Sequence, residues 1–119
     1  MSALALAEAL PTAATFDSLR RMVKSQAARR PGVYEFLDAT GGTIYVGKAK
    51  DLRTRLLSYF TAPWPESKSA RLVRCASQIR WRCLPSEFAA LLEEQRLISR
   101  LKPAYNVRGN LRRGRLSFV

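Results

Sequence analysis

The hydrophobic and polar positions of the chain follow two different periods, and each change of period marks the border of a short helix or strand. Apolar residues recur at helical spacing over residues 16–23, which predicts a short helix before the Pro-Gly break at residues 30–32. Two β-rich runs follow at residues 32–37 and 43–47. A turn-rich linker ending in two glycines joins them, so this part of the chain is predicted to form a β-hairpin.

The second half of the chain predicts helices on both sides of one further strand. Residues 50–60 place their apolar positions on one helical face, and residues 67–75 show a second, shorter helical pattern. Residues 79–84 alternate between apolar and basic side chains, as a strand does. Ser86 can cap a long helix that ends before Pro103.

The charge of the chain predicts a polyanionic partner. Its 21 Lys and Arg residues outnumber 9 Asp and Glu residues, which gives a net charge of +12. Two blocks without acidic residues, residues 20–30 with +5 and residues 96–119 with +7, bracket a nearly balanced centre. A basic run is often only a solvated face, but two such blocks around one core favour a shared phosphate-binding surface. Nucleic acid is therefore the expected partner.

The residue types that are missing restrict the chemistry. A chain of 119 residues has room for one domain, and it contains no histidine. Histidine-dependent triads and histidine-ligated zinc are excluded, so a general base must be Tyr, Lys or a carboxylate. Cys75 and Cys83 do not have metal-ligand spacing, and we expect them to stay reduced in a cytoplasmic protein. No run of residues is apolar enough to span a membrane.

One carboxylate lies in the middle of an apolar helical face. On the predicted long helix, Ala90, Leu97 and Leu101 belong to that face; Glu94 falls within it, and Glu93 lies off its edge. A carboxylate in this position is costly unless it is paired or bound to a cation. Two interpretations remain open: a salt bridge to an arginine, or a divalent cation held by one carboxylate and several waters, as suits magnesium chemistry on phosphates.

The predicted hairpin and the helix after it carry a second set of polar residues. Tyr34 and Tyr45 lie on the two strands, and Lys48 follows the second strand. Arg55 and Tyr59 are four residues apart and share an edge of the next helix. Each of these residues taken alone is typical of packing or of a solvated surface. Their order and spacing as a set indicate a site.

Three separated blocks of sequence contain these residues and read PGVYEF, IYVGKAKDLRTRLLSYF and SEFAALLEEQRLISRLKPAYNV. Together they resemble the GIY-YIG nuclease family, in the form found at the N-terminus of the bacterial excinuclease UvrC. The resemblance covers residues 31–107 and implies an α+β fold, a small three-stranded antiparallel β-sheet flanked by helices. Residues 1–30 would then be an N-terminal arm and short basic helix, and residues 108–119 a basic C-terminal segment. We expect either a fragment of a longer protein or a minimal stand-alone nuclease.

The resemblance implies a role for each residue that matches a family motif. The block LLEEQRLI matches the motif with the metal-binding glutamate and assigns that role to Glu94, with Glu93 as an additional carboxylate beside it. The asparagine of PAYN completes the set. The implied catalytic residues are Tyr34, Tyr45, Lys48, Arg55, Tyr59 and Asn106.

The activity implied by the resemblance is metal-dependent cleavage of a DNA phosphodiester bond, as in the incision step of nucleotide excision repair. Glu94 would hold a single Mg²⁺ or Mn²⁺ ion. Tyr34 is favoured as the general base, with its pKa lowered by Lys48, while Tyr45 orders the water. The reverse assignment of the two tyrosines remains open. Arg55 would neutralise charge on the phosphate.

DNA is the partner that this activity requires, and we expect a monomer without membrane association. A damage-recognition protein is a further expected partner if the chain acts in an excision repair system. The alternative function is a catalytically silent basic module that binds nucleic acid. Glu94 separates the two functions, because a pure binder gains nothing from an anion aimed at phosphate. The residues expected to contact DNA are Lys50, Arg53, Arg108, Arg112, Arg113 and Arg115.

Overall fold

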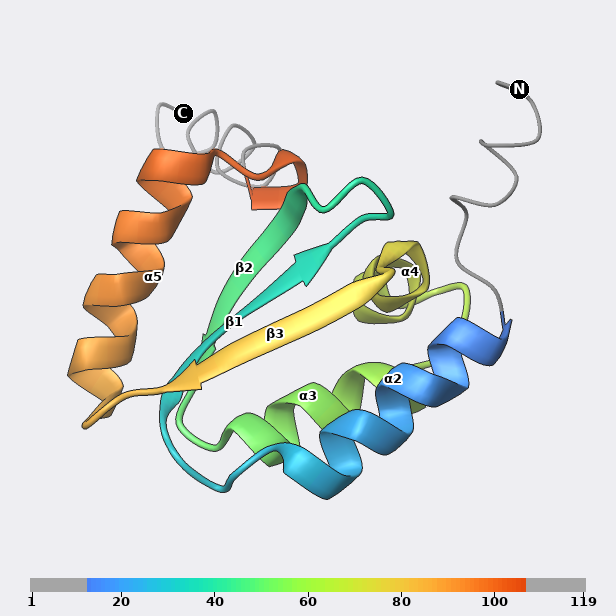
Figure 1. Cartoon of the computed structure of the whole chain (residues 1–119), viewed down its shortest axis with the longest axis horizontal. Helices are drawn as coiled ribbons and strands as arrows, with labels where there is room; N and C mark the ends of the chain where they lie inside the picture. The colour runs from blue at the N-terminus through green and yellow to red at the C-terminus, as the bar shows by residue number, and fades with distance from the viewer. Residues whose placement is uncertain (1–12, 107–119) are drawn as a thin grey trace.

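The structure is a computed structural model that describes residues 13–106, and its strands form one antiparallel sheet in the order β2-β1-β3 (Figure 1). The elements in chain order are α2 (Ala13–Gln26), β1 (Gly32–Leu37), β2 (Thr43–Ala49), α3 (Leu52–Thr61), α4 (Lys68–Cys75), β3 (Gln78–Cys83) and α5 (Glu87–Leu101). This arrangement confirms the α+β fold with a small three-stranded antiparallel sheet flanked by helices.

Side-chain caps and a proline determine where the helices begin and end. Asp51, Ser67 and Ser86 accept hydrogen bonds from backbone N–H groups in the first turns of α3, α4 and α5. Lys102 follows α5 in the left-handed conformation, with φ of 47°, and Pro103 comes next. The predicted cap at Ser86 and the predicted stop before Pro103 are both confirmed.

The turn of the β1–β2 hairpin is organised by Asp38. Its Oδ1 accepts hydrogen bonds from the backbone N–H groups of Thr40 and Gly42, each at 3.0 Å. Gly41 between them has a φ of +89°, which a residue with a Cβ rarely adopts. The predicted linker is therefore a defined turn, and it sets the register of the hairpin.

Each face of the sheet packs against different helices (Figure 1). On the face that we call the α3 face, Tyr34 and Phe36 join the main core with buried residues of α2, α3 and α4. On the opposite face, which we call the α5 face, Val33 and Val46 pack against Ala90 and Leu97 of α5 and a few neighbours. The alternation of side chains along the strands thus separates the two cores.

Gly32 allows β1 to start in close contact with β3 and α3. A Cβ at this position would lie 2.2 Å from the carbonyl oxygen of Arg82 and 2.6 Å from Cδ1 of Leu52. The carbonyl belongs to the backbone of a paired strand and cannot rotate away as a side chain can. Only glycine fits here without a shift of the sheet.

We predict that Gly32→Ala lowers the free energy of unfolding by about 1–3 kcal/mol, because the added methyl group overpacks a rigid site. Gly42→Ala is the matched control, since the nearest atoms to a Cβ there lie 3.6 Å away. Urea denaturation of both variants measures the difference. Equal midpoints for the two variants would show that the sheet tolerates the methyl group.

Candidate active site

A network of two tyrosine hydroxyls and one guanidinium lies on the α3 face of the sheet. The side chains of Tyr34 and Tyr59 are buried, and their hydroxyl oxygens are 2.6 Å apart. Arg55 donates its Nε–H to the Tyr34 hydroxyl at 3.3 Å, and its guanidinium lies 5.1 Å from the centre of the Tyr59 ring. The fold therefore brings three of the predicted catalytic residues into direct contact.

Gly47 makes the room that the Tyr34 ring occupies. The two residues are paired across β1 and β2, so they share a face of the sheet. A Cβ on Gly47 would lie 2.4 Å from both Cζ and the hydroxyl oxygen of Tyr34. Tyr45, two residues earlier on β2, is half-buried on the same face, with its ring centre 6.3 Å from that of Tyr34. The absence of a side chain at Gly47 therefore leaves the space that the outer end of the Tyr34 ring occupies.

Burial controls the acid–base state of the network. Desolvation is the main cause that raises the pKa of Tyr34, and the neighbouring Tyr45 adds to it, while Tyr59 and Arg55 act in the opposite direction. Desolvation, followed by the neighbouring Tyr34, also raises the pKa of Tyr59. Both hydroxyls are therefore protonated at neutral pH in the free protein.

Lys48 does not lie beside Tyr34. It pairs with Val33 across the hairpin, and this register places it on the α5 face, whereas Tyr34 is on the α3 face. Its side chain is exposed. The expectation that Lys48 lowers the pKa of Tyr34 is therefore wrong in its geometry, because the cation in contact with the Tyr34 hydroxyl is Arg55. A one-residue offset along a strand reverses the face, which the motif alone does not reveal.

Glu93 and Glu94 have different surroundings although they are adjacent on α5. Glu93 binds Arg82 of β3 and Arg96 of its own helix, and the hydrogen bonds and charge of Arg96, then the charge of Arg82, lower its pKa to about 2. Glu94 is half-buried and accepts a hydrogen bond from Gln95 at 3.3 Å. Within residues 13–106 it makes no ion pair. The salt bridge that we considered for Glu94 is formed by Glu93 instead.

The carboxylates of the described residues suit a hard cation bound by one side chain and water better than a metal site with three or more protein ligands. In the described part of the chain, no three His, Cys, Asp or Glu side chains gather at one point. Glu94 offers a carboxylate without an ion pair on the helix that covers the α5 face. One carboxylate with a shell of waters is a common way for proteins to hold Mg²⁺.

Asn106 acts on the backbone of β2. Its Oδ1 accepts the N–H of Val46 at 2.8 Å, and its Nδ2 donates to the carbonyl of Val46 at 3.0 Å. Val46 lies between Tyr45 and Gly47, so the amide pairs the open edge of the strand at the point where the site is built. The structure thus shows a positioning contact for Asn106, which its place in the motif did not indicate.

Basic residues of the predicted DNA surface gather at the start of α3. Lys50 is exposed and Arg53 is half-buried, on either side of the cap residue Asp51. Arg29, from the first basic block, donates to Asp51 at 3.4 Å and to Thr54 at 3.2 Å. Four of the predicted contacts lie outside the described residues: Arg108, Arg112, Arg113 and Arg115.

Within residues 13–106, no helix has the length and apolar character of a membrane-spanning segment.

Comparison with protein families and sequences identifies relatives. A family model described as UvrC-like GIY-YIG domain matches residues 30–107. UvrABC system protein C of Alcanivorax borkumensis is 50% identical over 80 residues, which is 67% of this chain and 13% of that protein. The protein of the same name from Proteus mirabilis is 47% identical over 83 residues, 70% of this chain and 14% of its own length. The chain thus spans about one seventh of the relatives that it matches.

Solved structures match the same region. The GIY-YIG N-terminal endonuclease domain of UvrC from Thermotoga maritima, bound to magnesium, aligns with a TM-score of 0.66 and 33% identity. The alignment covers 75% of this chain and 96% of that domain. A point mutant of the same domain, bound to its catalytic divalent cation, aligns with a TM-score of 0.67 and 32% identity over 75% of this chain and 94% of that one.

We predict that the chain loses stability as the pH rises above about 10, because Tyr34 and Tyr59 resist ionisation only when folded. In the unfolded chain the tyrosines release their protons near that pH, and this ionisation stabilises the unfolded state. The free energy of unfolding therefore decreases with pH until the pKa values of the folded tyrosines are reached. Denaturation from pH 8 to 11 measures the slope. The double variant Tyr34→Phe/Tyr59→Phe should lose stability less steeply over this range. An identical slope would show that the two buried hydroxyls ionise freely in the fold.

Proposed function

The chain belongs to the UvrC-like GIY-YIG family, and from this membership we propose that it is the endonuclease domain of a UvrC-type protein, cutting one DNA phosphodiester bond in nucleotide excision repair. The observation that carries the proposal is the contact of Tyr34, Tyr59 and Arg55, three motif residues from two elements. A silent DNA-binding module would have no use for two buried hydroxyls held beside a guanidinium.

Glu94 is the residue that would hold the cation. Its carboxylate is free of ion pairs within residues 13–106, whereas Glu93 is bound by two arginines. A bound Mg²⁺ ion supplies Lewis-acid stabilisation of the negative charge on the reacting phosphate. The Thermotoga maritima domain is bound to magnesium, and we propose the same ion here, with Mn²⁺ as a substitute of similar ligand preference.

The tyrosines and the arginine handle the proton and the phosphate charge. We assign Tyr34 as the proton acceptor, because the Nε–H of Arg55 and the hydroxyl of Tyr59 can both donate to its phenolate. Tyr45 lies half-buried beside it and would orient the attacking water. Arg55 retains further N–H groups for the phosphate. Lys48 would contribute charge from the α5 face rather than to Tyr34.

The partners follow from the same proposal. Relatives of the chain are proteins of the UvrABC system, and we propose that this domain likewise acts on DNA together with the other proteins of such a system. We further propose that residues 31–107 form the catalytic unit, that the domain is monomeric and that it works in the cytoplasm. Lys50, Arg53 and the arginines after residue 107 would contact the DNA backbone.

We predict that Glu94→Gln abolishes cleavage in Mg²⁺ but keeps DNA binding, because it removes the carboxylate ligand and one negative charge. Glu87→Gln is the matched control on the same helix, where the carboxylate is exposed at the first turn. Nicking of a labelled duplex and the Mg²⁺-dependent rise in melting temperature are measured for both. If Glu94→Gln still cuts and is still stabilised by Mg²⁺, another residue holds the ion.

We predict that Tyr34→Phe lowers the cleavage rate by about 10²–10⁴, the usual contribution of a general base. The raised pKa of Tyr34 keeps its base form scarce at neutral pH, so the wild-type rate should rise with pH up to at least ~10. Tyr105→Phe, which removes a hydroxyl that lies 3.4 Å from the sulfur of Cys75, is the control and should keep both rate and pH profile. A Tyr34→Phe protein that retains the wild-type rate, with Tyr45→Phe inactive, would move the base to Tyr45.

A further inference from the structure

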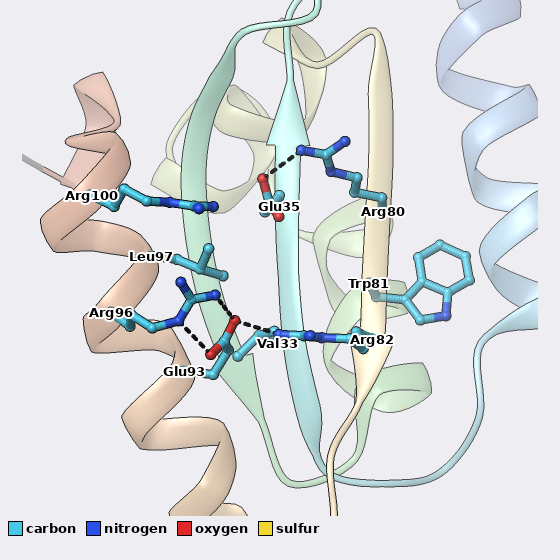
Figure 2. Close-up of a pocket in the computed structure, with 9 residues that line it drawn as sticks. All are labelled: Val33, Glu35, Arg80, Trp81, Arg82, Glu93, Arg96, Leu97 and Arg100. Carbon is cyan, nitrogen blue, oxygen red and sulfur yellow. Dashed lines mark hydrogen bonds and ion pairs between the residues drawn. The ribbon is translucent and has the colours of Figure 1, made fainter.

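A pocket of about 340 Å³ opens on the α5 face between β3 and α5 (Figure 2). α5 packs over β1 and β2 on this face, and the basic side chains of β3 remain beside the helix. The pairing of Val33 with Arg82 and of Glu35 with Arg80 places all four on the α5 face. The pocket is therefore on the opposite face of the sheet from the tyrosine network.

At one end of the pocket a single carboxylate holds two arginines from different elements. Glu93 binds Arg96 at 2.9 and 2.5 Å and also binds Arg82 (Figure 2). The Glu93 side chain is only 14% exposed, while those of Arg82 and Arg96 are more than half exposed. The two guanidiniums are thus fixed in place with their outer N–H groups open to a ligand.

The other end of the pocket contains Glu35, Arg80 and Arg100, and within the described residues Glu35 forms an ion pair with Arg80 but not with Arg100. Glu35 accepts hydrogen bonds from Arg80 at 3.2 Å and from Thr43 at 2.8 Å. Arg100 reaches across from α5 toward Glu35 (Figure 2), yet it makes no ion pair in the described part of the chain. This end of the pocket therefore presents an arginine whose charge is not neutralised by residues 13–106.

The balance of charge in the pocket favours an anion with more than one charged group. Four guanidiniums face two carboxylates, and both carboxylates are already covered by arginine. Arg80 and Arg82 are two residues apart on a strand, about 6.7 Å along its axis. Arg96 and Arg100 are four residues apart on a helix, about 6 Å along its axis. The cations thus form one row on β3 and one on α5, with spacings that suit a chain of charges.

We propose that this pocket binds the phosphate backbone of the DNA substrate away from the scissile bond, with one phosphate held between Arg80 and Arg100. The proposal rests on the proposed function for the choice of DNA as the polyanion. The guanidinium fork matches phosphate oxygens, and the chain's net charge of +12 favours a phosphate polymer over a single acidic peptide. The role is positional, since the pocket contains none of the residues assigned to the reaction.

The test compares Arg100→Gln with Lys68→Gln. Each variant removes one positive charge from a helical position, and Arg100 has no internal ion pair to break within residues 13–106. Binding of a labelled 20-base-pair duplex is measured by fluorescence anisotropy in EDTA over a series of salt concentrations. We expect Arg100→Gln to weaken binding about tenfold, as the loss of a charged hydrogen bond does. The slope of log K against log[salt] should fall by about 0.9.

Lys68→Gln should stay within about twofold of wild type, as for a surface charge outside the pocket. Arg100→Lys, which keeps the charge but not the fork, should bind between wild type and Arg100→Gln. In cleavage assays Arg100→Gln should raise KM and leave kcat at saturating DNA unchanged. Equal affinity and slope for Arg100→Gln and Lys68→Gln would overturn the proposal.

Two further outcomes separate this proposal from its rivals. If a glutamate-rich peptide binds the wild type and loses affinity in Arg100→Gln while DNA affinity is unchanged, the pocket is a protein-docking site and the proposal is wrong. If the wild type cuts no DNA but Arg100→Gln still weakens DNA binding relative to Lys68→Gln, the pocket proposal stands and the endonuclease assignment fails. The binding experiment in EDTA does not depend on cleavage.

Discussion

The alternation of side chains along β1 between the two faces of the sheet is the constraint on which both the tyrosine network and the arginine pocket depend. As the central strand of the sheet, β1 sends Tyr34 toward α3 and its neighbours Val33 and Glu35 toward α5. A slip of one residue in its pairing would move the tyrosine to the arginine pocket and the glutamate into the main core. The turn around Asp38 and the amide of Asn106, which pairs the edge of β2, both help to hold this register.

The proposed active site combines two buried tyrosine hydroxyls with the guanidinium of Arg55. Desolvation raises the pKa of a buried phenol, so little of it is in the phenolate form at neutral pH, and Tyr34 shows this effect. The fold offsets part of the penalty with Arg55, which approaches from the next helix and touches the hydroxyl directly. Packing of Tyr34 over Gly47 and against Tyr59 fixes the geometry before any substrate arrives. Such preorganisation costs no rearrangement during the reaction.

Helix geometry gives the adjacent residues Glu93 and Glu94 of α5 different surroundings. Each residue turns the chain by about 100°, so Glu93 and Glu94 lie on either side of the line through Ala90 and Leu97. Glu93 turns toward β3 and is neutralised by two arginines there. Glu94 turns the other way and keeps its carboxylate free of ion pairs in the described region. Of these two carboxylates, Glu94 is therefore the one available for a cation.

The elements, the cap at Ser86 and the motif residues could be predicted from the sequence, because periodicity, Ser86 before an apolar run and Pro103 act within a few residues of chain. The roles of particular side chains could not. That Arg55 rather than Lys48 touches Tyr34, and that Arg100 enters a pocket with β3, depends on strand register and helix rotation. Those are determined by packing between segments far apart in the chain, and a sequence pattern records only which residues are near each other along it.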